Sequence, residues 1–285
     1  MYLVHLTDPH LVAPGRRLFG LDPLIGLDAA LAHLSGRHAD ADLLLLTGDL
    51  TDTGEVLAYR ALHERLRALP MPAVLLLGNH DRRAAFREVF ADAPVDEGGF
   101  VQTVVDHPGG VSLVALDTLV AGAGHGSLGD GRLEWLDRML AARTEREVAI
   151  AMHHPPVPSG IPFMDAIGLV DAAAFWEVVS SHDQVRHVFC GHIHRTFFAR
   201  RGGVTVSSLP GTSHQVALAT EARDVALGSH EAGLYAIARI APGRIDLHHA
   251  AFADRSPRFV FDDTSNAAAT PADLPPVPSP YDRLA

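Results

Sequence analysis

The sequence predicts an α/β protein in which two β-sheets pack together and are flanked by helices. Apolar runs of strand length alternate with amphipathic, helical stretches along most of the chain. These runs are apolar throughout, not at alternate positions, which is typical of strands buried on both faces. Later apolar runs follow one another across short turns with no helix between them, which indicates antiparallel strands.

Each predicted element follows from its local pattern. Six uniformly apolar runs in the first two thirds of the chain are predicted strands: Tyr2–Leu6, Leu43–Thr47, Ala73–Leu77, Val111–Leu116, Val148–Met152 and Val188–Cys190. Four amphipathic stretches between them are predicted helices: Pro23–Ser35, Glu55–Leu69, Gly131–Ala142 and Asp171–Ser181. Three later runs are predicted antiparallel strands: Val204–Ser208, Leu234–Ile240 and Arg244–Ala250.

The length of 285 residues suits one large domain with a short appendage. We expect a catalytic domain over residues 1–251. Residues 252–285 become rich in proline and aspartate and predict an extended tail, either disordered or packed on the body or on a neighbouring subunit.

Composition excludes several classes of function. All 23 basic residues are arginine, which excludes sites that depend on a Walker or Schiff-base lysine. The net charge of −11 argues against a nucleic-acid polymer as partner, because affinity for phosphate backbones comes from basic patches. The sequence has no apolar run long enough for a membrane span and no signal peptide, so we expect a cytoplasmic protein. A single cysteine, Cys190, excludes an intrachain disulfide and a thiolate metal cluster.

Seven residues with metal-ligand chemistry lie at the ends of the apolar runs: Asp8, His10, Asp49, Asn79, His153, His192 and His194. The carboxyl ends of parallel strands meet at one edge of a sheet, so these side chains are expected to converge. The set is large enough for a centre of two metal ions. Paired cations a few ångströms apart typically serve the hydrolysis of phosphate esters.

Taken singly, the motifs have competing explanations. Asp8-Pro-His10 can be a surface turn, and Asp49 after Thr47-Gly48 can cap a turn or helix. Gly78-Asn79-His80-Asp81 is more specific, because it offers a neutral oxygen ligand and a histidine that the next carboxylate can hold.

The remaining motifs carry tandem or closely spaced histidines. Of His153 and His154 we expect one ligand, since adjacent side chains of an extended segment point to opposite sides. His192 and His194 are two residues apart and so face the same side. Five unrelated turns in this order are improbable. The mixture of Asp, Asn and His without cysteine favours Fe, Mn, Zn or Co, without choosing among them.

The ordered motifs closely resemble those of the calcineurin-like metallophosphoesterase superfamily, over residues 8–194. The segments Met152-His-His-Pro-Pro156, Met164-Asp165 and Leu209–Val216 are similar to class III cyclic-nucleotide phosphodiesterases, and most of all to the bacterial glycerophosphodiesterases of that group. The resemblance implies a four-layer α/β/β/α sandwich of two mixed sheets, and a homodimer or higher homo-oligomer.

The resemblance also implies how the ligands are divided. One metal would be held by Asp8, His10, Asp49 and His194. The second would be held by Asp49, Asn79, His153 and His192, so that Asp49 bridges the two. His80, oriented by Asp81, would be a catalytic residue that is not a ligand. Arginines that protein phosphatases of the superfamily carry after Gly-Asp are missing here, which disfavours a phosphoprotein substrate.

We therefore expect hydrolysis of a small anionic phosphodiester, of glycerophosphodiester or cyclic-nucleotide type, by a metal-bound hydroxide with His80 assisting. Three loops are expected to select the substrate: Leu11–Gly20, Ser159–Met164 and Thr212–Gln215. His214 suits bracing of a loop and substrate contact equally well, whereas Arg16 and Arg17 suit a solvated loop better than a phosphate clamp. The alternatives are a nuclease, a broad-specificity phosphoesterase and, least favoured, a non-catalytic interaction module.

Overall fold

The structure is a computed structural model that describes residues 1–221 and 225–256. The layers below belong to one unit, Met1–Phe252. Of the predicted tail at 252–285, the part from residue 257 onward lies outside the described residues.

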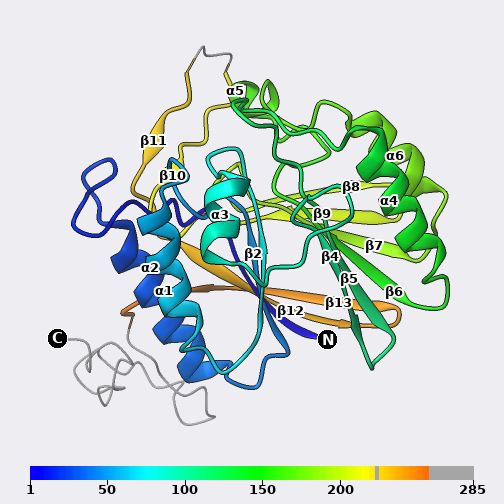
Figure 1. Cartoon of the computed structure of the whole chain (residues 1–285), viewed down its shortest axis with the longest axis horizontal. Coiled ribbons are helices and arrows are strands. Elements are labelled where there is room, and N and C mark those ends of the chain that lie inside the picture. Colours follow the sequence, from blue (N-terminus) through cyan, green and yellow to red (C-terminus); the bar gives the residue numbers. More distant parts are fainter. Residues whose placement is uncertain (222–224, 257–285) are drawn as a thin grey trace, which may run out of the picture. The chain divides into compact units, whose positions relative to one another are not determined.

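Two large mixed β-sheets form the centre of this unit (Figure 1). The first sheet has the order β13-β12-β1-β2-β3, with β1 (Tyr2–Leu6), β2 (Leu43–Thr47), β3 (Ala73–Leu76), β12 (Leu234–Ala241) and β13 (Arg244–Ala251). The second has the order β4-β5-β6-β7-β9-β8, with β4 (Thr103–His107), β5 (Val111–Ala115), β6 (Glu147–Ala151), β7 (Val185–Phe189), β8 (Phe197–Arg201) and β9 (Val204–Ser208). A separate ribbon pairs β10 (Gln215–Val216) with β11 (Gly228–Ser229).

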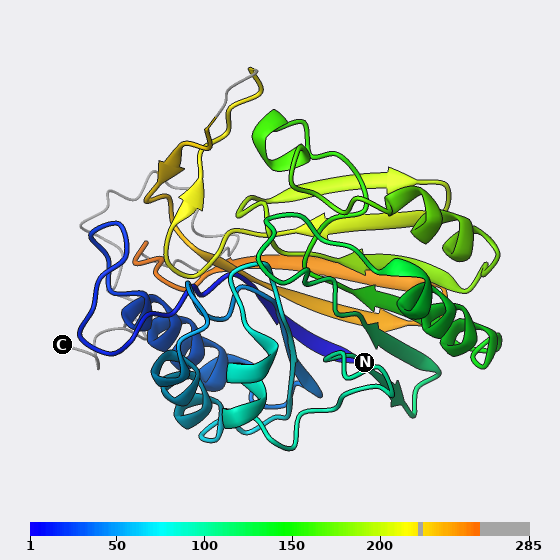
Figure 2. The same cartoon turned by 45° about the horizontal axis from the view of Figure 1, so that its top comes forward.

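Helices cover the outer face of each sheet (Figures 1 and 2). The first sheet is covered by α1 (Pro23–Arg37), α2 (Val56–Leu66) and α3 (Arg83–Val89). The second is covered by α4 (Gly129–Ala141) and α6 (Ala172–Ser180), while α5 (Pro162–Asp165) is a short turn in a loop. This arrangement confirms the predicted α/β/β/α sandwich. In the described part of the chain, no helix has both the length and the apolar character required to cross a bilayer.

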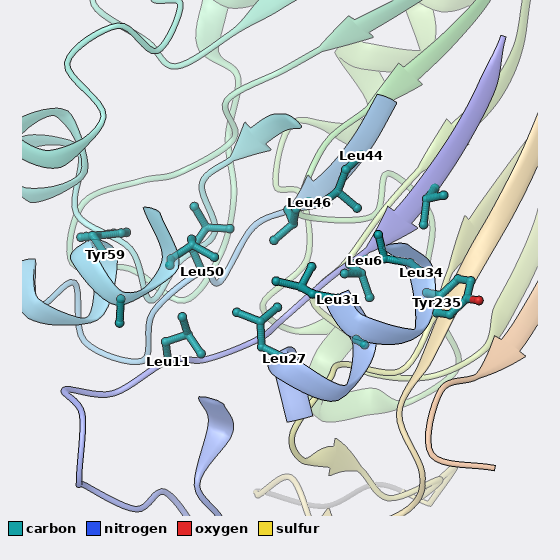
Figure 3. Packing of buried hydrophobic residues seen from close by; sticks show 14 of the residues in the cluster. Leu6, Leu11, Leu27, Leu31, Leu34, Leu44, Leu46, Leu50, Tyr59 and Tyr235 are labelled. Atoms are coloured by element: carbon teal, nitrogen blue, oxygen red, sulfur yellow. The ribbon is translucent and has the colours of Figure 1, made fainter. Parts of the chain in front are cut away.

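Three hydrophobic layers hold the sandwich together. Successive side chains of a strand point to opposite faces of its sheet, so one strand contributes to two of these layers. In β2, Leu44 and Leu46 face the helices, where they pack among α1 residues such as Leu27 and Leu31 (Figure 3). Leu43 and Leu45 face the second sheet and share a cluster with residues of β5, β6 and β7. A strand that is buried on both faces must be apolar at every position, which explains the run of four leucines. Burying each leucine contributes about 1.5–3 kcal/mol.

The predicted elements are largely confirmed, and the differences have physical reasons. The helices α3 and α5, the short ribbon of β10 and β11, and the edge strands β4 and β8 were not predicted. Both strands lie at edges of the second sheet, where β4 is half-buried and β8 largely exposed, so their sequences mix polar with apolar residues. The hairpin of β12 and β13 is antiparallel as expected. The run Val204–Ser208 forms β9, which is antiparallel to β8 but parallel to β7.

Candidate metal centre

The seven predicted metal ligands converge on one region, because each follows a strand that runs in the same direction as its neighbours. Asp8, Asp49 and Asn79 come after β1, β2 and β3, which are parallel. His153 and the pair His192 and His194 come after β6 and β7, which are parallel in the other sheet. The loops after β1 and β2 are joined by backbone hydrogen bonds, including His10 N to Asp49 O at 2.9 Å. Both sheets therefore contribute to one site.

Backbone strain is concentrated at these residues. Five of the predicted ligands adopt left-handed backbone conformations: Asp8 (φ 48), His10 (φ 45), Asp49 (φ 45), His192 (φ 73) and His194 (φ 47). Residues other than glycine avoid this region unless the surrounding structure enforces it, and such strain gathers at functional sites.

The glycines of the motifs allow the loops to approach closely. A Cβ atom on Gly78 would lie 2.2 Å from Oδ1 of Asp49, and one on Gly191 would lie 2.2 Å from Oγ1 of Thr7 and 2.8 Å from Oδ2 of Asp8. These positions have no room for a side chain. Glycine is thus required before Asn79 and His192 for steric reasons.

One group of ligand atoms joins both sheets. The ligand atoms of Asp8, His10, Asp49 and His194 all lie within 4.8 Å of one another, and all four side chains are buried. Nε2 of His10 lies 3.1 Å from Nε2 of His194 and 3.4 Å from Oδ2 of Asp49. Nε2 of His194 lies 3.4 Å from Oδ1 of Asp8. Two carboxylates and two imidazoles thus surround one point.

A second group shares an oxygen atom with the first. Nε2 of His153 lies 3.4 Å from Oδ2 of Asp49, the oxygen that also faces His10, and 3.2 Å from Oδ1 of Asn79. Nδ1 of His192 lies 3.1 Å from the same amide oxygen. Asp49 therefore stands between the two groups, in the place that a bridging ligand requires.

In His194 and His153, hydrogen bonds made by Nδ1 leave Nε2 free to bind a cation. Nδ1 of His194 donates to the carbonyl oxygen of His214 at 2.9 Å, and Nδ1 of His153 donates to that of Thr47 at 2.7 Å. A carbonyl only accepts, so Nε2 of each neutral ring carries a lone pair. Each lone pair faces a carboxylate oxygen at 3.4 Å. Such acceptors repel one another unless a cation lies between them, so the donor set fits metal ions.

The pKa shifts of His153 and His192, in the second group, also fit a metal site. Burial opposes the charging of His153, but the carboxylates of Asp49 and Asp8 and the hydrogen bond to Thr47 together outweigh burial and raise the pKa of His153 to about 9. A proton then occupies the place that a metal would take. Burial, followed by repulsion from His153, lowers the pKa of His192 to about 3, so that ring is neutral. In the described part of the chain, its buried Nε2 has no hydrogen-bond partner.

His80 lies at the rim of this cluster and is held by a residue that the sequence did not suggest. Its side chain is 41% exposed, in contrast to the buried side chains of His10 and Asp49. Nδ1 of His80 donates to the carbonyl oxygen of Asp52 at 2.8 Å and lies 3.7 Å from the Asp52 carboxylate, which also faces Nδ1 of His10 at 3.3 Å. Asp52 lies shortly after Asp49 in the sequence, and nothing in its position along the chain marked it as a partner of His80.

Asp81 does not orient His80, contrary to our expectation from their adjacency. Its buried carboxylate accepts hydrogen bonds from the backbone of Leu50, Thr51 and Gly78 and from the hydroxyl of Tyr59 at 2.8 Å. These bonds fix the loops that carry Asp49 and Asn79. Burial, with the charge of Asp49, raises the pKa of Asp81 to about 6.

Two other histidines, His154 and His214, lie next to the cluster and contact its surroundings. Both ring nitrogens of His154 are engaged, by Thr118 Oγ1 at 2.8 Å and Gly124 O at 3.2 Å. The ring of His214 packs 4.8 Å from that of His10 and 4.9 Å from that of His194.

Two arginines of the surrounding loops and helices form ion pairs with nearby carboxylates. Arg83 forms a bidentate ion pair with Asp117, at 2.7 Å for each bond. Arg16 pairs with Glu55 at 2.8 Å across an exposed surface, as expected for a solvated loop.

Two cavities border the cluster. One, of about 740 Å³, is lined by Asp52, Asn79, His80 and Arg82 together with apolar residues such as Leu119. The other, of about 610 Å³, is lined by His214 and His230 together with apolar residues such as Phe19 and Leu227. A reacting group held at the cluster thus has space on two sides for its substituents.

The chain is similar in sequence to several known proteins. The sequence profile described as calcineurin-like phosphoesterase matches residues 1–196. The chain is 39% identical, over 93% of its length and 97% of the relative, to a Rhodopseudomonas palustris protein named probable cyclic nucleotide phosphodiesterase. It is 32% identical to a 3′,5′-cyclic adenosine monophosphate phosphodiesterase of Pseudomonas aeruginosa, over 75% of this chain and 77% of that one. It is 30% identical to a glycerophosphodiester phosphodiesterase of Enterobacter lignolyticus, over 76% and 79%.

Solved structures with little sequence identity share the fold. A dimetal phosphatase from Danio rerio superimposes with a TM-score of 0.66 at 16% identity, covering 88% of this chain and 96% of that one. A purple acid phosphatase from yellow lupin superimposes with a TM-score of 0.65 at 15% identity, covering 98% of this chain and 56% of the other.

Proposed function

The chain belongs to the calcineurin-like phosphoesterase family, and from this premise we propose that it is a metal-dependent phosphodiesterase acting on small phosphodiesters. The relatives named as cyclic-nucleotide and glycerophosphodiester phosphodiesterases support a diester substrate. The observation that carries the proposal is the position of Asp49 Oδ2, 3.4 Å from Nε2 of His10 in one group and 3.4 Å from Nε2 of His153 in the other.

We assign the residues to two metal sites. Asp8, His10, Asp49 and His194 would hold one ion, and Asp49, Asn79, His153 and His192 the other. Fe, Mn, Zn and Co all suit this set of carboxylate, amide and imidazole donors. When bound, the two ions would polarise the phosphate oxygens and make water a stronger nucleophile.

His80 would act from the rim of this centre. Its Nδ1 proton is committed to the Asp52 carbonyl, so the ring is held in one orientation and Nε2 remains for the substrate. In its protonated form, Nε2 of His80 would donate to a phosphate oxygen or give its proton to the leaving alkoxide. The lack of lysine is less of a handicap for a diester, which carries one negative charge, than for a monoester.

The first test compares substrates in the protein loaded with Mn or Co. Bis(4-nitrophenyl) phosphate should be hydrolysed with a much higher kcat/KM than the 4-nitrophenyl monoester. A preference for the monoester, or cleavage of long DNA in place of the small diester, would contradict the proposal.

The second test concerns the shared carboxylate. Asp49→Ala should abolish hydrolysis of the diester and lower the metal content at both sites, as measured by elemental analysis. A folded Asp49→Ala protein with two equivalents of metal and normal turnover would refute the bridging assignment. His80→Ala should keep both metals and lose turnover, and it serves as the matched variant that leaves the ligands intact.

A further inference from the structure

Phe19 has a backbone conformation that the rest of the site does not explain. In the described part of the chain, six residues other than glycine have a positive φ; five are predicted metal ligands, and the sixth is Phe19, at φ 49. A bulky aromatic residue adopts this conformation only where its surroundings enforce it. Leu18 and Leu21 pair through mutual backbone hydrogen bonds of 2.8 and 2.9 Å, which place Phe19 at the tip of a tight loop. The strained backbone thus places the Phe19 side chain at the exposed tip of the loop.

The Phe19 ring is exposed yet lies close to the metal centre. Its side chain is among the large exposed apolar groups, at 66%. The ring contacts the ring of His214, with centroids 4.8 Å apart and planes at 70°. His214 in turn packs against His10 and His194, at 4.8 and 4.9 Å. A single imidazole therefore separates Phe19 from two predicted ligands.

A second contact holds the loop in place from the opposite side. Nε2 of His230 donates to the carbonyl oxygen of Phe19 at 3.1 Å. His230 directly follows β11, so the loop that carries Phe19 is linked to the β10–β11 ribbon. Residues of the loop and of the ribbon together line the open cavity of about 610 Å³.

The lining of this cavity carries no acidic or arginine side chain among the residues that the structure describes. The side-chain amide of Gln215 is already used, since it donates to and accepts from the backbone of Gly211 at 2.9 and 2.8 Å. The polar groups that remain are the imidazoles of His214 and His230 and the hydroxyl of Ser229, which has no hydrogen-bond partner in the described part of the chain. A glycerol arm could use these few groups but has no flat face to stack against Phe19, and this separates it from an aromatic substituent.

We propose that this cavity binds a flat aromatic group, such as a nucleobase, that belongs to the substrate and stacks against Phe19 while the phosphate lies at the metal centre. The inference rests on the proposed function and narrows it from small diesters in general to diesters that carry an aromatic or nucleoside group. An exposed aromatic ring beside an imidazole offers faces on which a base can stack. Every base has a flat π-face, so such stacking does not depend on which base is bound.

The test uses diesters that share one leaving group. Phenyl 4-nitrophenyl phosphate and methyl 4-nitrophenyl phosphate both release 4-nitrophenolate, so a difference in kcat/KM reports the group that remains. The wild type should favour the phenyl ester. Phe19→Leu should lower kcat/KM for the phenyl ester about tenfold, given the usual strength of base–aromatic stacking, and leave the methyl ester within about twofold. Phe19→Tyr keeps a ring and should retain the preference.

Binding supplies an independent measurement. In metal-loaded protein, Phe19→Leu should weaken the binding of adenosine monophosphate about tenfold and leave that of glycerol 3-phosphate unchanged, as measured by titration calorimetry. Phe198→Leu is the matched control, because Phe198 is also exposed, at 51%, but lies on β8 and does not line this cavity.

The outcomes separate the inference from the proposed function. Equal kcat/KM for the two diesters, unchanged by Phe19→Leu, would overturn the aromatic subsite while the phosphodiesterase assignment stands. Equal loss on both diesters would overturn it too, because Phe19 would then act on the reaction as a whole. A metal-loaded protein that hydrolyses neither diester would overturn the proposed function itself and the inference with it.

Discussion

The imidazole of His5 is linked to the carboxylate of Asp8 through two buried hydroxyl groups. His5 Nε2 lies 2.8 Å from Oγ1 of Thr47, Thr47 donates to Oγ1 of Thr7 at 2.7 Å, and Thr7 donates to Oδ2 of Asp8 at 2.6 Å. A carboxylate only accepts, and each hydroxyl has one proton, so His5 must donate to Thr47. All the protons thus point toward Asp8, and the chain of bonds fixes the orientation of one predicted ligand.

Removing the hydroxyl nearest to Asp8 should weaken one metal site selectively. Thr7→Val keeps the shape of the side chain and deletes the donor. We expect the affinity of the site that contains Asp8 to fall about 10- to 100-fold, as for other partners that orient metal ligands. Calorimetric titration with Co or Mn measures this. The site formed by Asn79, His153 and His192 is the internal control, and equal affinity changes at both sites would contradict the role given to Thr7.

His80 and Asp81 should respond to substitution in opposite ways, although they are adjacent. His80→Ala should lower kcat for the diester about 10²- to 10⁴-fold and change the free energy of unfolding little, because the side chain lies at the rim. Asp81→Asn should cost about 1–3 kcal/mol of stability, since an amide cannot accept from all the donors that converge there. Urea unfolding and single-substrate kinetics separate the two effects. A stable Asp81→Asn protein with the kinetics of His80→Ala would restore the expected pairing of the two residues.

The acid sensitivity of the fold should depend on His187, which is buried between the sheets and bonded to Oγ of Ser207 at 2.7 Å. Burial lowers the pKa of His187 from 6.5 to about 4. Between these values the unfolded chain binds a proton at this ring and the folded chain does not, so stability falls as the pH drops from about 6.5 to about 4. At pH 5 the loss should be about 2 kcal/mol.

Denaturant unfolding at pH 7.5 and pH 5 checks this dependence. His187→Gln should lose less stability than the wild type between the two pH values, by about the same 2 kcal/mol. His248→Gln, which changes an exposed histidine, should behave as the wild type does. Identical pH dependence of wild type and His187→Gln would show that this ring is not the source.

Two glycine substitutions should have opposite effects on stability. A Cβ on Gly191 would collide with Oγ1 of Thr7 at 2.2 Å, so Gly191→Ala should cost about 1–3 kcal/mol and displace Asp8. Gly131 in α4 has open space where a Cβ would lie, so Gly131→Ala should stabilise the protein by up to about 1 kcal/mol. Thermal unfolding and metal content measure both. Full metal content in Gly191→Ala would show that the neighbouring loop yields without moving the ligand.

Order and spacing along the chain were enough to predict the sheets and the set of candidate ligands. Uniformly apolar runs such as Leu43–Leu46 are typical of strands buried on both faces, and the polar residues after parallel strands reach the same edge of the sheet. Asp49, Asn79 and His153 were therefore predictable as candidates. The edge strands β4 and β8 were not, because an edge exposes part of its side chains and loses the apolar pattern.

Which neighbours act together depends on the tertiary structure. It places Asp52 and not Asp81 beside His80, because Asp81 is buried by donors from three separate segments while Asp52 remains at the rim. It also places Phe19 next to His214, which is distant in the sequence, and no local pattern records that contact. Spacing along a chain fixes which side of one element a residue occupies, whereas contacts between elements depend on how the loops fold against one another.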